Sequence, residues 1–88
     1  MRSGEEAGRL VAGTRQVLRL IASGGACKVL LALDADPRMR ETLRQAAQGA
    51  GVPVEDCESM ALLGKLCRIA VPCAAAARTK APDLGAQS

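Results

Sequence analysis

A short apolar run in the first half of the chain is the feature that most constrains its fold. The run, Cys27 to Leu33, reads CKVLLAL and is bounded by Gly24-Gly25 and by the turn sequence Asp34 to Pro37. An almost continuously apolar segment of this length, set between turn signals, is typical of a central strand buried on both faces of a sheet. We therefore expect a layered α/β domain built around this strand.

The segments on either side of this strand alternate between helix and strand. Thr14, Asp36 and Ser59 are each suited to cap the start of a helix, and Pro37 suits a first helical position. The alanine-rich run from Cys73 to Ala77 is ambiguous because alanine favours helix, but its place after a helix and a proline predicts a last strand. Strands are expected at Leu10 to Ala12, Cys27 to Leu33, Val52 to Cys57 and Cys73 to Ala77, and helices at Arg15 to Ser23, from Pro37 to the glycines at 49 and 51, and after Ser59.

This order predicts a three-layer α/β/α sandwich with a small mixed sheet of about four strands. The 88 residues are enough for one domain with one core. We expect that domain to span residues 1–80, with a short helical turn at Glu5 to Ala7 and a flexible C-terminal tail at 81–88.

Composition limits the ways in which the chain can bind a partner. It contains no Phe, Trp or Tyr, so bases cannot stack on aromatic side chains. Any contact with nucleic acid must rely on charge, hydrogen bonds and shape. The formal net charge of +3 is compatible with nucleic acid but does not establish it.

The four cysteines favour a reducing environment over disulfides or zinc. Cys27, Cys57, Cys67 and Cys73 include no C-x-x-C pair, and the chain contains no histidine. Each lies in an apolar stretch, so we expect small buried hydrophobic residues and no metal site. The polar N-terminus and the shortness of the apolar runs predict a cytoplasmic protein.

An enzymatic function is disfavoured. Without histidine, tyrosine or a G-x-S-x-G motif, the usual bases and nucleophiles are missing. Asp34 and Asp36 are better explained as turn and cap residues than as paired carboxylates. Gly24-Gly25 lacks the spacing and the lysine of a phosphate-binding loop. We expect no catalysis and no cofactor.

The segment from Arg15 to Ser23 forms an amphipathic pattern. At about 100° per residue, Arg15, Gln16 and Arg19 fall on one side of the helix and aliphatic residues fill the other. A cation in the first turn is unfavourable for the helix dipole, yet the backbone N–H groups there attract anions and hydrogen-bond acceptors. Taken alone, this pattern favours an ordinary solvated helix face over a binding site.

Three blocks in this order and spacing resemble a known family. The blocks are GTRQVLRLIASG, VLLALDADP and ESMALLGKLCRIAVPCAAAA. Together they resemble the ribosomal protein L-seven-Ae/L-thirty-e superfamily, and most of all its short bacterial branch, over about residues 9–78. The resemblance implies a monomeric protein that binds a kink-turn, an RNA duplex bent at a three-nucleotide bulge beside tandem sheared G·A pairs.

The resemblance also implies which residues contact RNA. In the family, the helix after the first strand enters the widened major groove at the G·A pairs. Arg15, Gln16 and Arg19 would then contact guanine edges and phosphates, while Gly13 and Thr14 would allow close backbone approach. Ordinary A-form RNA has a major groove too narrow for this, so the resemblance implies that the bend is part of what is recognised.

The other implied contacts come from two later blocks. Asp36 occupies the acidic position of the second block, Arg40 follows on the helix behind it, and Met60 stands where many relatives have Lys. The loop expected to cover the bulged nucleotides comprises Ile69, Ala70, Val71 and Pro72, with Ala74 just beyond it. Several of these residues also have an explanation that involves no RNA. Asp36 is then only a helix cap, Gly13 only a turn residue, and Ile69 and Val71 only ordinary loop residues.

Three departures from the family pattern bear on these contacts. Arg15-Gln16 replaces the Asn-Glu of archaeal members, Arg68 stands where glycine is common after Cys67, and Met60 removes one cation. A protein-interaction domain of the same fold, without RNA binding, is the alternative function.

Overall fold

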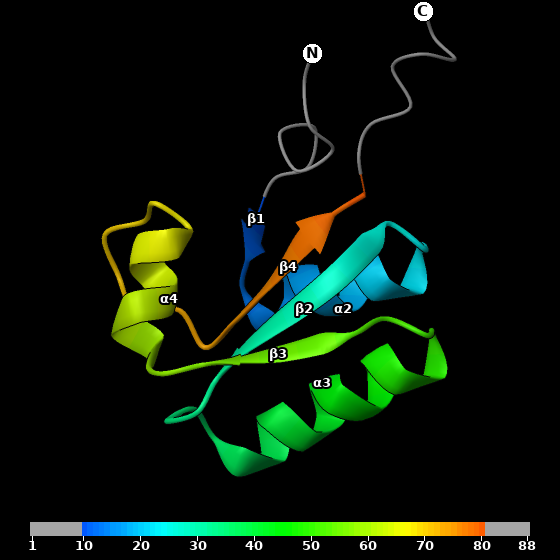
Figure 1. Ribbon diagram of the computed structural model, residues 1–88, viewed down its shortest axis with the longest axis horizontal. Coiled ribbons are helices and arrows are strands. Elements are labelled where there is room, and N and C mark those ends of the chain that lie inside the picture. Colours follow the sequence, from blue (N-terminus) through cyan, green and yellow to red (C-terminus); the bar gives the residue numbers. More distant parts are fainter. Residues whose placement is uncertain (1–9, 81–88) are drawn as a thin grey trace, which may run out of the picture.

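The computed structural model describes residues 10–80, which form three helices and four strands (Figure 1). The helical turn expected at Glu5 to Ala7 and the tail expected at 81–88 lie outside these residues. In chain order the elements are β1 Leu10–Ala12, α2 Thr14–Ala22, β2 Ala26–Ala32, α3 Pro37–Gly49, β3 Val54–Cys57, α4 Met60–Leu66 and β4 Ala75–Thr79.

The strands form one mixed sheet in the order β1-β4-β2-β3. Strand β4 runs antiparallel to both β1 and β2, whereas β2 and β3 are parallel and are joined through α3. The last strand of the chain therefore lies inside the sheet, between the first strand and the second. The predicted α/β class and four-stranded mixed sheet are confirmed.

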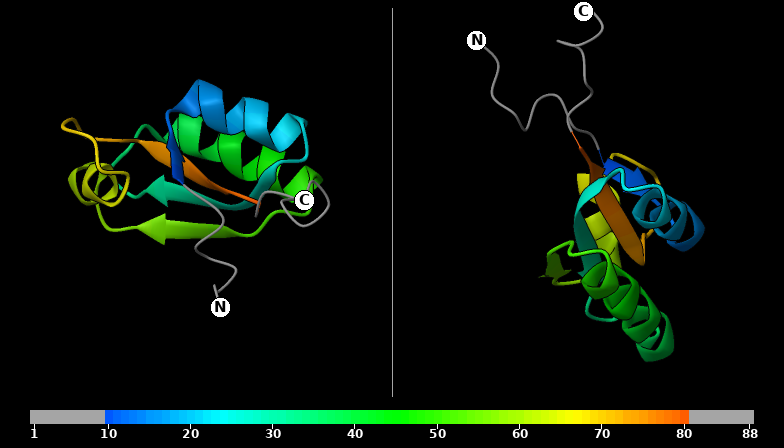
Figure 2. Two further views of the ribbon diagram at one scale, coloured as in Figure 1. Left: turned by 90° about the horizontal axis from the view of Figure 1, so that it is seen from above. Right: turned by 90° about the vertical axis from the view of Figure 1, so that its right-hand side faces the viewer.

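Strand β2 is buried on both faces, as the apolar run predicts. Val29 and Leu31 pack in a cluster with α2 and α3, while Leu30 and Ala32 pack in a second cluster with α4. Figure 2 shows α2 and α3 side by side on one face of the sheet. Because successive side chains of a strand point to opposite faces, the two clusters establish the expected three layers.

The alanine run forms a strand despite its helical propensity. Ala75, Ala76 and Ala77 have no exposed surface, since β4 is flanked by strands and covered by helices. Small side chains at these positions let helices approach the sheet closely. The strand begins at Ala75 and not at the predicted Cys73, because the Cys73 N–H donates to the Met60 carbonyl at 2.9 Å instead of joining the sheet.

Two of the three predicted helix caps are confirmed. The Asp36 carboxylate accepts from the Arg38 N–H at 3.0 Å, with Pro37 as the first helical residue, and the Ser59 hydroxyl accepts from the Leu62 N–H at 3.1 Å. The prediction for Thr14 was wrong. Gly13 holds the cap position without a side-chain bond, and Thr14 is already helical.

Other boundaries move by one or two residues. Helix α2 covers Thr14–Ala22 and leaves Ser23 as its C-cap, whereas α3 continues through Gly49 and ends before Gly51, which has a φ of +72°. Strand β3 begins at Val54 because the Val52 N–H bonds back to the Ala47 carbonyl. Strand β2 covers Ala26–Ala32, so Leu33 falls outside it and is 49% exposed.

The prediction that all four cysteines are buried was wrong for Cys27. Cys57 and Cys73 are buried, Cys67 is half-buried, and Cys27 is exposed. Cys27 lies beside an irregularity in the β2–β4 pairing, where Ala26 turns inward instead. All four thiols are free.

The part of the chain that the structure describes contains neither a metal-binding cluster nor a membrane-spanning helix. Residues 10–80 contain no group of three or more potential ligands placed to hold a metal ion. None of the three helices in this range combines the length and the apolarity that a membrane crossing requires.

Candidate nucleic-acid interface

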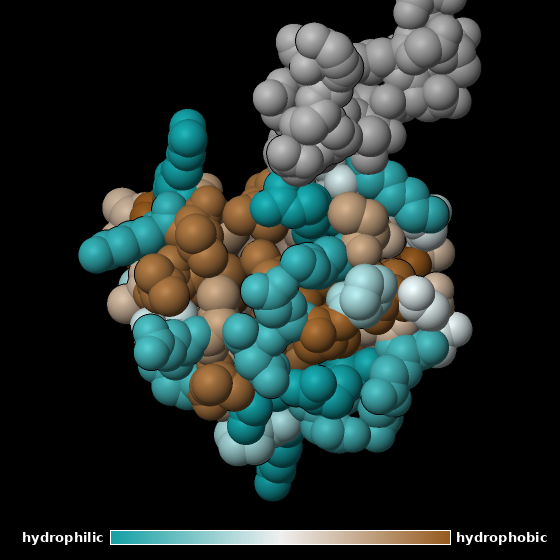
Figure 3. Space-filling view, viewed as in Figure 1, coloured by the Kyte–Doolittle hydropathy of each residue, from teal (hydrophilic) through white to brown (hydrophobic). Residues whose placement is uncertain are grey.

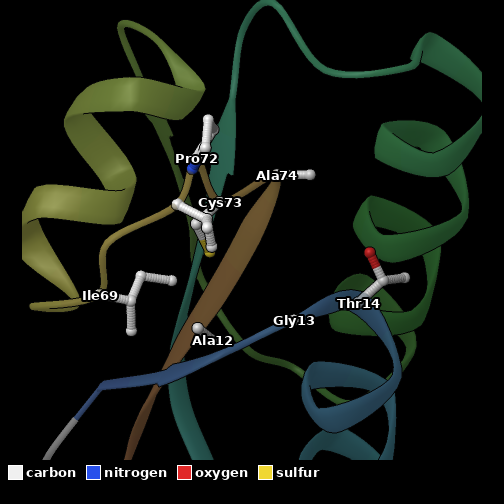
Figure 4. Close-up of a pocket in the computed structure, with 8 residues that line it drawn as sticks. Ala12, Gly13, Thr14, Ile69, Pro72, Cys73 and Ala74 are labelled. Atoms are coloured by element: carbon white, nitrogen blue, oxygen red, sulfur yellow. The ribbon is translucent and has the colours of Figure 1, made fainter.

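Two segments that are far apart in the sequence meet to form a shallow apolar cavity of about 300 Å³. One is the junction between β1 and α2, and the other is the loop between α4 and β4. Figure 4 shows Ile69 of the loop across from the chain that runs from Ala12 to Thr14, with Cys73 between the two segments. The lining residues are Ala12, Gly13, Thr14, Ile69, Val71, Pro72, Cys73 and Ala74.

Helix α4 holds the loop wall of this cavity in place. The Ile69 N–H donates to the Gly64 carbonyl at 3.1 Å, and the Cys73 N–H donates to the Met60 carbonyl at 2.9 Å. Gly64 is buried where the loop backbone crosses the helix. A Cβ at this position would overlap the Val71 carbonyl oxygen and lie 3.3 Å from the Pro72 Cα.

Gly13 and Thr14 shape the opposite wall. Gly13 has a φ of +107°, a conformation that L side chains rarely adopt, and its N–H donates to the Ala75 carbonyl at 2.9 Å. The Thr14 hydroxyl donates to the Met39 sulfur at 2.8 Å. Through this contact, the start of α2 is tied to the first turn of α3.

Helix α2 presents its polar face to solvent just beyond the cavity. Arg15, Gln16 and Arg19 are exposed, while Val17 and Ile21 of the opposite face are buried, as the helical wheel predicts. No side chain caps the first turn and no acidic residue lies in it. The first helical bond comes from the Val17 N–H, so the preceding N–H groups point outward beside Arg15.

The residues predicted on α3 lie near this site but do not line the cavity. The Asp36 carboxylate acts as the helix cap, so the structural alternative for this residue is realised. Arg40 is half-buried, and its Nε is buried with no hydrogen-bond partner among the described residues. Both follow the turn after β2, close to the Thr14–Met39 contact.

The remaining predicted residues belong to α4 and its loop. Met60 is half-buried at the first position of α4, and Ala70 is exposed in the loop without lining the cavity. Arg68 has a φ of +61°. This left-handed conformation favours glycine, which gives a physical reason for the glycine common at this position in the family that the sequence resembles.

Sequence reasoning missed four residues that build the site. Ala12 and Cys73 line the cavity, Gly64 lies under the loop, and the Asp34 carboxylate accepts from the Met60 N–H at 2.8 Å, which anchors the start of α4. Only Gly64 carried a usable signal, because a glycine inside an apolar helix often marks a close backbone approach.

Apolar side chains are exposed around α4 and its loop. Figure 3 shows them gathered on the side of the molecule formed by α4, with long polar side chains projecting around them. Leu62 is 40% exposed, Leu66 49% and Val71 61%. The site thus joins a cationic helix face, an apolar cavity and an apolar loop.

Comparison with known proteins assigns the chain to a family. Residues 2–86 match the model of the ribosomal protein L7Ae/L30e/S12e/Gadd45 family. The chain belongs to this family. The resemblance of the three sequence blocks is therefore confirmed.

Relatives within the family include several bacterial proteins. An RNA-binding protein of Geobacillus sp. is 44% identical over 72 residues, which cover 82% of this chain and 88% of the relative. RNA-binding protein YbxF of Geobacillus stearothermophilus shows the same identity and coverage. An RNA-binding protein of Bacillus pumilus is 33% identical over the same shares of both chains.

A solved structure shows the same fold. The 15.5 kD RNA-binding protein of Giardia lamblia superimposes with a TM-score of 0.77 at 32% identity. The match covers 89% of this chain and 66% of the Giardia protein.

Proposed function

We propose that this protein is a non-enzymatic RNA-binding protein that recognises and stabilises kink-turn RNA. It would act as a monomer in the cytoplasm, on ribosomal or regulatory RNA. The observation that carries the proposal is the apolar cavity, because it lies between the two segments that the family resemblance assigns to RNA. The names of the relatives and of the Giardia structure support RNA as the partner.

The cavity suits an unstacked base. Its volume of about 300 Å³ is at the lower end of small-molecule sites, so it suits one flat group. Its walls are apolar side chains and backbone, with Ile69 and Pro72 on one side and Ala12 on the other. A base extruded at the bulge would gain apolar contact there without the aromatic side chains that this chain lacks.

The polar face of α2 suits the stem next to the bulge. Arg15 and Arg19 can donate to guanine O6 and N7 or to phosphate oxygens, and Gln16 can donate and accept at a base edge. The exposed N–H groups of the first turn add donors beside them. A widened groove would receive this face, and the bulged nucleotide would then reach the cavity.

A comparison of two RNAs tests the proposal. A kink-turn duplex should bind much more tightly than a control in which the tandem G·A pairs become Watson–Crick pairs. Fluorescence anisotropy at fixed salt measures both. Affinity should fall linearly with salt on a double logarithmic scale, because phosphate contacts release counterions. Equal binding of the two RNAs would reject the proposal.

Two substitutions of Asp36 can separate its role as a helix cap from a role in RNA binding. Asp36→Ala should lower the free energy of unfolding by about 1 kcal/mol, because the cap of α3 is lost. Asp36→Ser should restore stability, since serine also caps, yet it should still weaken RNA binding because the carboxylate is gone. Urea unfolding and RNA titration of both variants measure this. Full RNA affinity in Asp36→Ser would make the residue a cap only.

A protein-interaction function is the second candidate. It is favoured by Leu62 and Leu66, which are exposed on α4 without lining the cavity. An exposed apolar patch often marks a protein contact. Absence of kink-turn binding in a folded sample would favour this candidate.

A further inference from the structure

The loop wall of the cavity begins beside an arginine in an unusual backbone conformation. Arg68 has a φ of +61° and directly precedes Ile69, the first loop residue that lines the cavity. Residues other than glycine rarely adopt this left-handed conformation, because their Cβ then crowds the backbone carbonyl. The Arg68 side chain is exposed and has no hydrogen bond or ion pair among residues 10–80. No contact within the described part of the chain therefore accounts for an arginine at this position.

The backbone around Arg68 closes helix α4 without using the arginine side chain. The Arg68 N–H donates to the Lys65 carbonyl at 3.0 Å. The Ile69 N–H donates to the Gly64 carbonyl at 3.1 Å. These are the two bonds of a Schellman motif, in which glycine is the usual left-handed residue. Glycine would make the same bonds without strain, and strained residues of this kind cluster at ligand-binding sites.

The two segments that wall the cavity carry only positive charge. Residues 10–33 and 60–80 contain no Asp or Glu. Arg15 is the residue after the first wall, and Arg68 is the residue before the second. Both side chains are exposed, and the ion pairs among the described residues lie at β3. The cavity is therefore bracketed by two arginines that have no carboxylate partner in residues 10–80.

An RNA strand that places a base in the cavity brings an anion to each of its sides. The backbone continues in both directions from such a nucleotide, so one phosphate lies on its 5′ side and another on its 3′ side. Thr14 and Ile69 lie on opposite sides of the cavity (Figure 4), and each is next to an arginine in the chain. We propose that Arg68, with Lys65 in the last turn of α4, binds the backbone phosphate on the α4 side of this nucleotide. The inference rests on the proposed function and gives it a second cationic contact, opposite to α2.

The chemistry of these two side chains suits a phosphodiester. A guanidinium group can donate two parallel N–H bonds to one phosphate, and a lysine ammonium adds a point charge beside it. Phosphate contacts fix the position of a nucleic acid but carry no sequence information. Arg68 should therefore add affinity for any base in the cavity, whereas preference for the G·A pairs stays with α2.

A purely structural role for these cations is the alternative. Positive charge at the end of a helix interacts favourably with the helix dipole, and both Lys65 and Arg68 lie at the end of α4. That role predicts that Arg68→Gly lowers stability and leaves RNA affinity unchanged. A role in RNA binding predicts the opposite pair of results, because glycine relieves the strain and removes the cation.

Urea unfolding and fluorescence anisotropy of Arg68→Gly test the inference. The urea midpoint should stay the same or rise, while affinity for a kink-turn duplex should fall by about threefold to tenfold and the salt slope should become shallower by about one. Lys80→Ala is the matched control. Lys80 is an exposed cation beyond the far end of β4, about 20 Å along the strand from Ala74 at the cavity. Wild-type affinity in Arg68→Gly, or an equal loss in Lys80→Ala, would overturn the contact.

Neutral phosphates in the RNA locate the contact. Each phosphate beside the bulged nucleotides is replaced in turn by an uncharged methylphosphonate. At one of them the wild-type protein should lose affinity, and Arg68→Gly should lose no more, because the two changes remove the same contact. Losses that add at every one of these phosphates would overturn the assignment.

The wild-type protein separates failure of this inference from failure of the proposed function. If it binds the kink-turn no better than the Watson–Crick control, the proposed function fails and the Arg68 contact fails with it. If it prefers the kink-turn and Arg68→Gly binds equally well, only the Arg68 contact is rejected.

Discussion

Replacing Arg15 and Arg19 together with alanine should lower the affinity for kink-turn RNA by tenfold to a thousandfold. Each arginine can form a bidentate contact with a guanine edge, which is worth about 1–3 kcal/mol, or neutralise a phosphate. Both side chains are exposed on α2 next to the cavity, so their loss should leave the core intact. Fluorescence anisotropy at fixed salt measures the affinity, and the salt slope should become shallower.

A matched control removes two cations elsewhere. Lys28 and Arg44 pair with Glu55 and Asp56, at β3 and away from the cavity. Exposed ion pairs of this kind contribute little stability, so Lys28→Ala with Arg44→Ala should still fold. This control should bind RNA almost as the wild type does. If both double variants lose the same affinity, net charge alone binds the RNA; if neither loses any, α2 is not the RNA-binding helix.

Gly64→Ala should have the second large effect, through the loop rather than through direct contact with RNA. Its Cβ would overlap the Val71 carbonyl oxygen, which is backbone and cannot turn aside as a side chain would. Overpacking of this kind costs about 1–3 kcal/mol of folding stability or forces the backbone to shift. A shifted loop moves Val71 and Pro72 out of the cavity wall. We therefore expect a lower free energy of unfolding and a loss of RNA affinity of tenfold or more.

Gly49→Ala is the matched control. Gly49 is also helical, but a Cβ there would meet nothing within 4 Å. Alanine is favoured over glycine within a helix, so this variant should gain about 0.5–1 kcal/mol of stability and keep its RNA affinity. Urea unfolding and RNA titration of both variants give the comparison. A Gly64→Ala protein with wild-type stability and wild-type affinity would show that the loop does not depend on this contact.

The same pair of measurements separates folding from binding. Reduced stability should not by itself lower the measured RNA affinity as long as nearly all of the protein is folded, because RNA binds the folded protein. Titration is therefore made where unfolding curves show that Gly64→Ala is folded. Loss of affinity under those conditions is attributable to the position of the loop.

Local patterns determined much of the fold without any reference to the structure. The apolar run predicted a strand buried on both faces, since a segment with no polar alternation can only lie between two layers. The caps Asp36 and Ser59 were predictable because each side chain bonds within its own turn. The polar face of α2 was predictable for the same local reason, helical periodicity.

Tertiary structure decided what depends on neighbours distant in sequence. Gly13, and not Thr14, became the cap of α2 because the Gly13 N–H bonds to β4 and the Thr14 hydroxyl turns to Met39. The alanine run became a strand because two strands flank it, against its own preference for helix. Cys27 became exposed at an irregular pairing that no sequence signal marks.

In the candidate site, too, some features follow from the local sequence and others depend on the tertiary structure. From residues alone, the opening of α2 was an exposed basic helix face, and the family resemblance proposed RNA for it and for the loop after α4. The sequence by itself determined which side chains α2 presents, because periodicity and capping act within a few residues. Only the tertiary structure brought the 69–74 segment against Ala12 to Thr14, since the cavity arises where β4 pairs with β1. The contact of Gly64 with the loop backbone likewise exists only once α4 and its loop pack together.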